Sequence, residues 1–415
     1  MTNQRIKARY RLQTTGDGRR VAEVMAGEQS SGTFIAIPGE SAELKERSAA
    51  RVEHFSELQQ AAPAPLPGAV AGELRTYEME LSWPVDNLGL SLTNLLATVA
   101  GNLFELKQVA GLKILDIDLP DAFAAAYPGP GFGVAGTRQL SGVEGRPLIG
   151  TIIKPSVGLS AAETAALVDQ LCEGGIDFIK DDELQGDGYY CSFEDRARAV
   201  MEVIERHAQR SGKKVMFAFN LTGELDEMQR RHDLVESLGG TCVMLSLNSV
   251  GLTGFNAFRK HCRLPIHAHR NGWGYLGRSE QNGWSYVAWQ KIWRLAGVDH
   301  MHVNGLSNKF WEPDDSVIAS ARACSTPMFS DKSCAVMPVF SSGQSAKQIP
   351  ATYQMLQSPD FLYCAGGGIV AHPAGIAAGV RALRQSWDAA RDNIALATAA
   401  QSHAELKQAL ETFGS

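Results

Sequence analysis

The stretch Gly174-Gly175-Ile176-Asp177-Phe178-Ile179-Lys180-Asp181-Asp182-Glu183 brings a lysine and carboxylates to the end of a short apolar run. Side chains alternate faces along a strand, so we expect residues 176–180 to form a buried strand with Lys180 and Asp182 on the same side and Glu183 just beyond. Mg²⁺ takes oxygen ligands, whereas a lysine ammonium, with an ordinary pKa of about 10.4, would repel it. The conflict disappears if the Lys180 amine takes up CO₂ as a carbamate, a third anionic ligand beside Asp182 and Glu183. A solvated strand end is the alternative interpretation.

Length and composition limit the class of protein. A chain of 415 residues favours two domains over one. A hydrophobic share of 44% and a charged share of 20% are typical of a soluble globular protein. The net charge of -6 argues against nucleic acid or an anionic membrane as partner, although a local phosphate pocket stays open. We expect a cytoplasmic enzyme, because the chain shows no apolar run of about 18 residues, no secretory signal, and seven cysteines without C-x-x-C spacing.

The pattern of elements changes near residue 125. Residues 1–125 mix expected strands (6–12, 21–28, 33–38) with expected helices (41–59, 90–101), which predicts an α+β, ferredoxin-like domain. Residues 126–415 alternate strands and helices, which predicts an α/β class (β/α)₈ TIM barrel with C-terminal helices. A doubly wound sheet is the alternative, disfavoured because no Gly-x-Gly-x-x-Gly follows a first strand. The expected barrel strands are 148–153, 176–180, 214–219, 241–246, 264–268, 299–303, 336–341 and 361–364.

Polar side chains collect where these strands end, and active sites of barrels lie at the carboxyl ends of the strands. Lys154 follows the first strand, His269 the fifth and His302 the sixth. Any one of these histidines could be purely structural, but several polar side chains at the same rim favour an active site. Glycines at 366–368 follow the last strand, where backbone N–H groups and a helix start would attract a phosphate.

Four segments of the barrel resemble motifs of the ribulose-bisphosphate carboxylase (RuBisCO) large-subunit superfamily. They are residues 150–160, residues 174–183, His267-Ala268-His269-Arg270 and Asp299-His300-Met301-His302, with Lys309 at the family's interval beyond. The resemblance implies catalytic roles for Lys154, His269 and Lys309, and Mg²⁺ held by carbamylated Lys180, Asp182 and Glu183. It also implies substrate and phosphate contacts from Arg270, His302, Ser341, Gly343, Gly366 and Gly367.

The first domain carries a second resemblance. Glu28-Gln29-Ser30-Ser31-Gly32-Thr33 and Gly101-Asn102-Leu103-Phe104 are similar to two family motifs. In the family such residues reach the active site of the neighbouring subunit, which implies roles for Glu28, Thr33 and Asn102 and a homodimer, or a larger assembly of dimers. Without the barrel motifs, a solvated strand end for Glu28 and a helix-end position for Asn102 would suffice.

Departures from the carboxylase pattern indicate a RuBisCO-like protein of the form IV type that does not fix CO₂. Ser156 stands where the family has a second lysine, Ile152 replaces a threonine, and Trp273 replaces a histidine. The segment 307–313 reads Ser-Asn-Lys-Phe-Trp-Glu-Pro instead of the family's loop. Loss of a cation and a hydroxyl near the substrate argues against a ligand with two terminal phosphates.

A dication that stabilises an enediolate, with Lys154 as acid or base, supports several reactions. We favour a Mg²⁺-dependent carboxy-lyase of carbohydrate metabolism acting on a small phosphorylated substrate, as in the branch that decarboxylates 3-oxo-isoapionate-4-phosphate, because Lys309 would neutralise a substrate carboxylate. The alternative is the methionine-salvage enolase or isomerase acting on 2,3-diketo-5-methylthiopentyl-1-phosphate. The parent carboxylase, an amidohydrolase-type metal hydrolase and a catalytically dead homologue fit the sequence less well.

Overall fold

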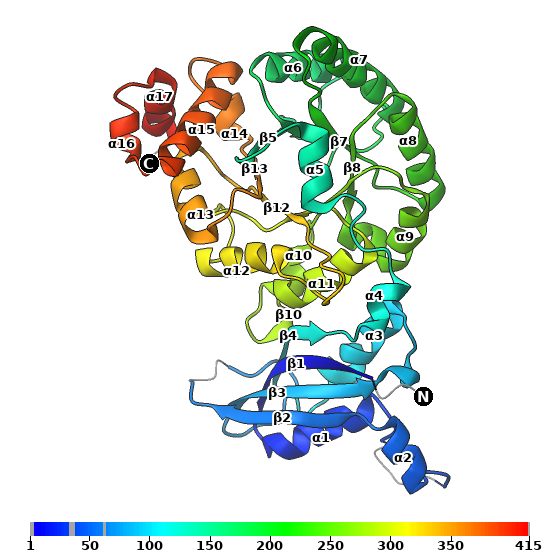
Figure 1. The fold of residues 1–415 in the computed structure, drawn as a ribbon. Helices are drawn as coiled ribbons and strands as arrows, with labels where there is room; N and C mark the ends of the chain where they lie inside the picture. The colour runs from blue at the N-terminus through cyan, green and yellow to red at the C-terminus, as the bar shows by residue number, and fades with distance from the viewer. Residues whose placement is uncertain (1–3, 33–37, 61–63, 414–415) are drawn as a thin grey trace. The chain divides into compact units, whose positions relative to one another are not determined.

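The computed structural model describes residues 4–32, 38–60 and 64–413, which form two compact units. The first unit comprises Met1–Pro128 with Gly272–Leu295 and Phe329–Lys332. The second comprises Gly129–Asn271, Ala296–Met328 and Ser333–Ser415. Each unit has its own sheet (Figure 1), and each has its own buried core.

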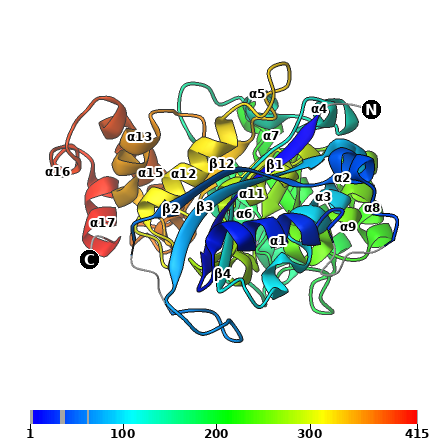
Figure 2. The same cartoon turned by 90° about the horizontal axis from the view of Figure 1, so that it is seen from below.

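The first unit is built on a five-stranded mixed sheet in the order β10-β4-β1-β3-β2. The central strand β1 pairs antiparallel with β3 and with β4, and β10 adds a parallel edge strand to β4. Helix α1 packs on one face of the sheet (Figure 2). The bounds are β1 Arg5–Thr14, α1 Gly18–Glu28, α2 Ala42–Ser48, β2 Arg51–Leu58, β3 Arg75–Pro84, α3 Leu92–Val99, β4 Gly111–Asp118, α4 Ala122–Ala126, α10 Trp273–Gly277, β10 Asn282–Trp284 and α11 Tyr286–Ala296, with short 3₁₀ turns at Val85–Asn87 and Gly101–Glu105.

Two expected elements of this unit are wrong. Residues 21–28 were expected as a strand but belong to α1, whose N-cap Asp17 accepts a hydrogen bond from the Arg20 amide at 3.0 Å. Residues 41–59 were expected as one helix, but α2 ends at Ser48 and β2 pairs antiparallel with β3. Most of the expected strand at 33–38 lies outside the described residues.

The second unit is a closed barrel of eight parallel strands, which confirms the expected fold class. All eight expected strand positions contain a strand, each within two residues of its expected start. Apolar side chains from neighbouring strands fill the barrel, among them Phe178, Met216, Met244 and Leu362. In barrel order the strands are β5 Leu148–Ile152, β6 Phe178–Lys180, β7 Met216–Asn220, β8 Cys242–Ser246, β9 Ile266–His269, β11 His300–His302, β12 Met337–Phe340 and β13 Leu362–Cys364.

Helices surround the barrel and alternate with its strands (Figure 1). Helix α5 is tied to the amino-terminal side of β11, because Asp299 Oδ1 accepts from the amides of Phe132 and Gly133 at 2.6 and 2.8 Å. Helices α6 and α7 have side-chain N-caps, Ser160 and Ser192. The helices are α5 Gly133–Ser141, α6 Ala161–Glu173, α7 Phe193–Ser211, α8 Leu225–Ser237, α9 Leu247–His261, α12 Asp314–Ser325, α13 Ile349–Leu356, α14 Gly367–Val370, α15 Ile376–Arg391, α16 Leu396–Ala399 and α17 Ala404–Phe413, with a 3₁₀ turn at Ala346–Gln348.

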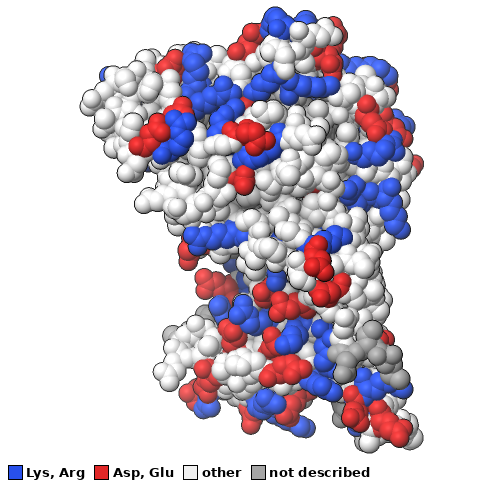
Figure 3. Space-filling view, viewed as in Figure 1, with Lys and Arg blue, Asp and Glu red and all other residues white. Residues whose placement is uncertain are grey.

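The surface carries both signs of charge. Lysine and arginine side chains are interspersed with aspartate and glutamate side chains on the face drawn in Figure 3. Within the described part of the chain, no helix combines the length and the apolarity that crossing a bilayer requires.

Candidate active site at the barrel rim

The candidate residues of the barrel lie at the carboxyl ends of its strands. Lys180, His269 and His302 are the last residues of β6, β9 and β11. Lys154 follows β5 by two residues, and Ser341 directly follows β12. The parallel register of neighbouring strands brings all these ends to one rim, so the barrel gathers residues that are up to 187 positions apart, from Lys154 to Ser341.

Lys154 is held against a carboxylate that lies just beyond the next strand, β6. Its Nζ donates to Asp182 Oδ2 at 2.6 Å and to Ser156 Oγ at 2.7 Å. Ser156, which stands where the family motif has a second lysine, therefore serves the first lysine as a hydrogen-bond acceptor. The Asp182 side chain is buried whereas Lys154 is partly exposed. The lysine amine can therefore exchange protons with a bound molecule while these two hydrogen bonds hold it in place.

Lys180, Glu183 and His269 form a second group. The buried Lys180 Nζ donates to the Asp181 carbonyl oxygen at 2.8 Å and to Glu183 Oε2 at 3.4 Å, and His269 Nε2 lies 3.4 Å from the same Glu183 oxygen. Burial, followed by the charge of Lys180, lowers the pKa of His269 to about 4. Burial alone would raise the pKa of Glu183, but in the acid range where Glu183 titrates His269 is protonated as well as Lys180, and these two positive charges hold the pKa below its usual range. At neutral pH the group therefore holds an ionised Glu183 and a neutral imidazole.

Lys180, Asp182 and Glu183 fit a divalent cation if Lys180 carries a carbamate. Asp182 and Glu183 face two lysines, Lys154 and Lys180, so the present charges balance without a metal. A carbamate on Lys180 would replace one cation by an anionic oxygen donor, and three oxygen ligands suit an octahedral Mg²⁺ whose other positions hold water and substrate. Lys180, Asp182 and Glu183 would then hold the ion.

The loops after β12 and β13 lie against Lys309 and Lys154. A Cβ built on Gly343 would lie 3.6 Å from Lys309 Cβ, and one built on Gly366 would lie 3.9 Å from Lys154 Cε. Gly367 has open space at the Cβ position. Gly368 needs its lack of a side chain, because a Cβ there would come within 2.6 Å of the Gln344 carbonyl oxygen. Helix α14 begins at Gly367 and is only one turn long, so the backbone N–H groups here contribute more to an anion site than a helix dipole does.

Arg270, expected to bind phosphate, contacts a carboxylate of the protein. Its Nη2 lies 2.5 Å from Glu312 Oε2, and both side chains are buried. The same Glu312 oxygen accepts from Asn304 Nδ2 at 2.6 Å, while its other oxygen accepts from Ser316 at 3.0 Å. Glu312 and Asn304 could not be recognised from the sequence, because a glutamate in a polar loop is usually solvated. Arg270 is therefore partly neutralised before any ligand binds.

Lys309 differs from the other two lysines of the rim. Its Nζ lies 5.2 Å from the centroid of the Phe310 ring, a cation–π distance. Among residues 4–32, 38–60 and 64–413, no carboxylate oxygen lies within 4.0 Å of this nitrogen. Lys309 is exposed. It is thus a cation free to meet an anionic group of a ligand.

Glu28 and Asn102, two of the residues expected to serve a neighbouring subunit, lie together in the first unit. Asn102 Nδ2 donates to Glu28 Oε1 at 3.4 Å, although the two residues are 74 positions apart. Glu28 ends α1 and Asn102 lies in a 3₁₀ turn, so neither stands at a strand end. Thr33 lies outside the described residues.

A third titratable cluster lies away from the rim. The atoms of His232, Asp233 and His261 that could bind a metal lie within 4.8 Å of one another. However, His232 Nε2 accepts from the Arg263 amide at 3.1 Å, so the single proton of the neutral ring sits on Nδ1 and is directed at Asp233. No lone pair of His232 remains for a metal, and we do not regard the cluster as a metal site.

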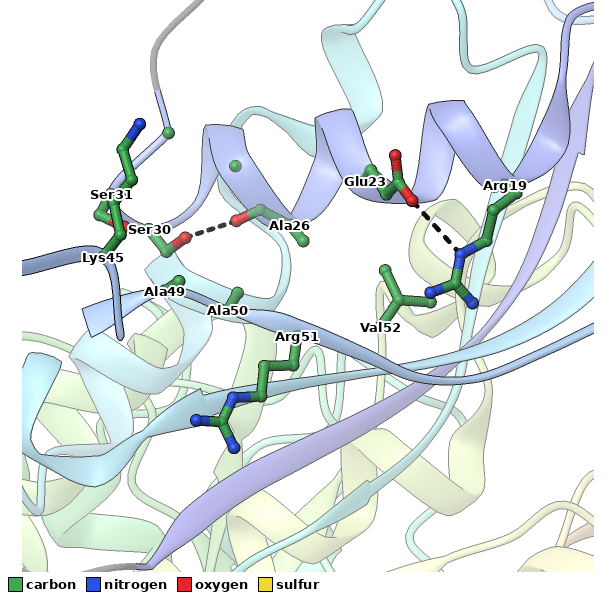
Figure 4. Close-up of a pocket in the computed structure, with 12 residues that line it drawn as sticks. Arg19, Glu23, Ala26, Ser30, Ser31, Lys45, Ala49, Ala50, Arg51 and Val52 are labelled. Carbon is green, nitrogen blue, oxygen red and sulfur yellow. Dashed lines mark hydrogen bonds and ion pairs between the residues drawn. The ribbon is translucent and has the colours of Figure 1, made fainter. Parts of the chain in front are cut away.

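The first unit contains a pocket of about 410 Å³ between α1, α2 and the start of β2 (Figure 4). Three of its four charged side chains are in ion pairs: Arg19 Nε lies 3.5 Å from Glu23, and Lys45 Nζ lies 2.8 Å from Glu40, which is not part of the lining. Its lining contains no histidine or cysteine among the described residues, and it includes Gly32, the last residue described before a gap. The pocket is therefore a weaker candidate than the barrel rim.

Comparisons with known proteins agree with this geometry. Residues 133–413 match the family described as ribulose bisphosphate carboxylase large chain, catalytic domain, and residues 3–123 match its N-terminal domain. The chain is 56% identical over 409 residues to a 3-oxo-isoapionate-4-phosphate transcarboxylase/hydrolase of Xanthobacter autotrophicus, covering 98% of this chain and 99% of the relative. It is 45% identical over 412 residues to a 3-oxo-isoapionate-4-phosphate decarboxylase of Rhizobium rhizogenes, covering 98% of each. The crystal structure of a rubisco-like protein from Burkholderia fungorum matches with a TM-score of 0.92 at 46% identity, covering 98% of this chain and 99% of that one.

Proposed function

This chain belongs to the ribulose bisphosphate carboxylase large-chain family as a RuBisCO-like protein, and from that premise we propose that it removes the carboxyl group of 3-oxo-isoapionate-4-phosphate. Two relatives that match nearly the whole chain carry this substrate in their names, and both names describe a reaction at its carboxyl group. Decarboxylation is the reaction that the rim favours.

The observation that carries the proposal is the contrast among the three lysines of the rim. Lys154 pairs with Asp182 and Lys180 with Glu183, whereas Lys309 has no carboxylate partner in the described part of the chain. A substrate carboxylate beside Lys309 would complete the third pair. An enolase substrate that lacks a carboxylate would leave this cation unmatched, which favours the lyase over the methionine-salvage enolase.

The chemistry needs an electron sink and a proton. When the bond to the carboxyl carbon breaks, its electron pair passes to the adjacent ketone and gives an enediolate, while CO₂ leaves. Mg²⁺, when bound by Lys180 carbamate, Asp182 and Glu183, would supply Lewis-acid stabilisation of the negative charge on oxygen. Lys154 Nζ, positioned by Asp182 and Ser156, then donates a proton to the carbon that carried the carboxylate and regains one from solvent.

Transcarboxylation followed by hydrolysis is the second candidate. It is favoured by one observation, the higher identity to the transcarboxylase/hydrolase, 56% against 45% for the decarboxylase. Both reactions begin by breaking the same carbon–carbon bond, so the roles of Lys309 and Lys154 in that step are shared. They differ in the fate of the carboxyl carbon, which leaves as CO₂ in one and stays in a non-volatile acid in the other.

The active unit in this proposal is a homodimer in which Glu28 and Asn102 of one subunit complete the rim of the other. The pair is prearranged, because Asn102 orients the Glu28 carboxylate by a hydrogen bond.

A substrate panel tests the proposal. Purified protein with Mg²⁺ and bicarbonate is incubated separately with 3-oxo-isoapionate-4-phosphate and with 2,3-diketo-5-methylthiopentyl-1-phosphate. We expect consumption of the first and no change in the second. Turnover of the diketone alone would replace the lyase with the enolase.

A further inference from the structure

We infer that Thr137, on α5, fixes the proton positions of three buried histidines and thereby makes Ser341 a hydrogen-bond acceptor toward the substrate. The statement about substrate rests on the proposed function, whereas the proton positions do not. Ser341 was expected to donate a hydrogen bond to a phosphate. In this inference it instead accepts a hydrogen bond from a hydroxyl group of the substrate.

A continuous string of hydrogen bonds crosses the barrel interior. It begins at Thr137 Oγ1, which lies 2.8 Å from His300 Nε2. His300 Nδ1 lies 3.3 Å from His267 Nδ1, and His267 Nε2 lies 2.7 Å from His302 Nε2. The string ends where His302 Nδ1 lies 3.0 Å from Ser341 Oγ at the rim.

The direction of the first hydrogen bond in the string, between Thr137 and His300, is fixed. Thr137 Oγ1 donates its only proton to the Gly133 carbonyl oxygen, 2.5 Å away. The hydroxyl must then accept a proton from His300 Nε2. Thr137 and His300 are both fully buried, so water does not offer an alternative partner.

The three imidazoles are neutral, so each carries one proton. Burial lowers the pKa of His300 to about 3. Burial, assisted by the neighbouring histidines and by Lys180, also lowers the pKa values of His267 and His302 far below their ordinary value. A neutral ring has one N–H donor and one acceptor nitrogen, so the direction at one end determines every bond that follows.

The tautomers follow in order. His300 is protonated on Nε2, so its Nδ1 accepts from Nδ1 of His267. His267 Nε2 then accepts from Nε2 of His302. His302 Nδ1 is left as an acceptor, and Ser341 must donate its hydroxyl proton to it.

Ser341 therefore offers only lone pairs to a ligand. The neighbouring Ser342 does not reverse this, because its own proton goes to Asn304 Oδ1 at 3.0 Å. A fully ionised phosphate oxygen cannot donate to Ser341, whereas a hydroxyl group of a sugar acid can. At the Thr137 end of the string no solvent can take up a proton. The string therefore positions Ser341 and does not relay protons.

The direct test is ¹⁵N NMR of ligand-free protein labelled in its histidine rings, at a pH where the three rings are neutral. We expect His302 to be protonated on Nε2 with a bare Nδ1, His267 on Nδ1 and His300 on Nε2. A His302 ring protonated on Nδ1 would overturn the inference. Because no substrate is present, this result is independent of whether the proposed function holds.

Two substitutions test which residue sets the direction. Thr137→Val removes the acceptor of the His300 Nε2 proton at nearly constant volume, and we expect both tautomers of His302 to become populated. Thr137→Ser keeps the hydroxyl and should keep the wild-type spectrum. An unchanged His302 signal in Thr137→Val would exclude Thr137 as the residue in control.

Sulfate, an anion without a proton to donate, tests the role of Ser341 in binding. By calorimetry, Ser341→Ala should change sulfate affinity by less than about twofold, since no hydrogen bond from Ser341 to the anion is lost. A loss of about tenfold or more, as expected for a charge-assisted hydrogen bond, would contradict the acceptor role.

Discussion

Arg270 and Glu312 form a buried ion pair at the rim of the barrel, with Arg270 Nη2 2.5 Å from Glu312 Oε2. The pair joins the end of β9 to the loop that carries Lys309. Asn304 and Ser316 donate to the same carboxylate, so the loop is held by three separate donors. The position of Lys309 therefore depends on Glu312, three residues further along the chain, whose carboxylate is paired within the protein.

Glu312→Ala should destabilise the protein by about 3–5 kcal/mol, because it leaves the buried Arg270 guanidinium without its carboxylate. The free energy of unfolding from urea denaturation measures this loss. Glu194→Ala is the matched control: its partner Arg198 and Glu194 are both more than half exposed, so we expect a loss within about 1 kcal/mol. Equal effects of the two substitutions would show that the Arg270–Glu312 pair is not a buried structural pair.

Lys180→Ala should abolish turnover and weaken Mg²⁺ binding, because the two remaining carboxylates leave the octahedral ion one protein ligand short. Bicarbonate should activate the wild-type enzyme and leave the variant unaffected. Metal affinity is measured by equilibrium dialysis, with Lys309→Met as the control that retains the metal ligands. Full activity in Lys180→Ala would exclude the carbamate.

Subunit mixing tests the shared active site. Glu28→Gln and Lys154→Ala should each be inactive alone, but a random mixture of the two should regain up to about a quarter of the activity, since one site of each heterodimer then carries neither lesion. Exchange is verified by mass spectrometry of the native dimers. Failure to recover activity after verified exchange would place Glu28 outside the neighbour's site.

Stability should fall as the pH falls below about 6.5. Burial lowers the pKa of His300 from 6.5 to about 3 in the folded state, so between these values the unfolded chain binds a proton that the folded protein does not. Each such histidine then contributes a loss of up to about 1.4 kcal/mol per pH unit. Urea midpoints between pH 7.5 and 5.5 measure the slope, and His300→Gln should make it shallower. A flat profile in the wild type would contradict a neutral, buried His300.

The barrel was predictable from the sequence because each strand is a short apolar run followed by polar residues, as in residues 176–183. The first domain was less predictable. Val21, Ala22, Met25 and Ala26 bury one face of a helix, but in a short window they resemble a strand, and Asp17 was the overlooked capping signal. Residues 51–58 are a strand through pairing with β3, a tertiary effect that local propensity does not encode.

The candidate site likewise contains residues that could be predicted from the sequence and residues that could not. Lys154, Lys180, Asp182 and His269 were expected from motif and strand position, and the barrel brings them to one rim. Glu312 and Thr137 act only through partners that are 42 and 163 positions away, Arg270 and His300. Such pairings depend on how loops and helices pack on the barrel, which no local pattern records.

The most direct test of the central claim is the fate of the carboxyl carbon of 3-oxo-isoapionate-4-phosphate labelled there with ¹³C. We predict Mg²⁺-dependent release of ¹³CO₂ and, in D₂O, one deuterium on the carbon that carried the carboxylate. Lys309→Met should reduce the rate and the affinity without loss of metal binding, because the carboxylate loses its counter-ion. Consumption of the substrate with all label retained in non-volatile acids would contradict decarboxylation and establish the transcarboxylase, and no consumption at all would contradict the proposed substrate.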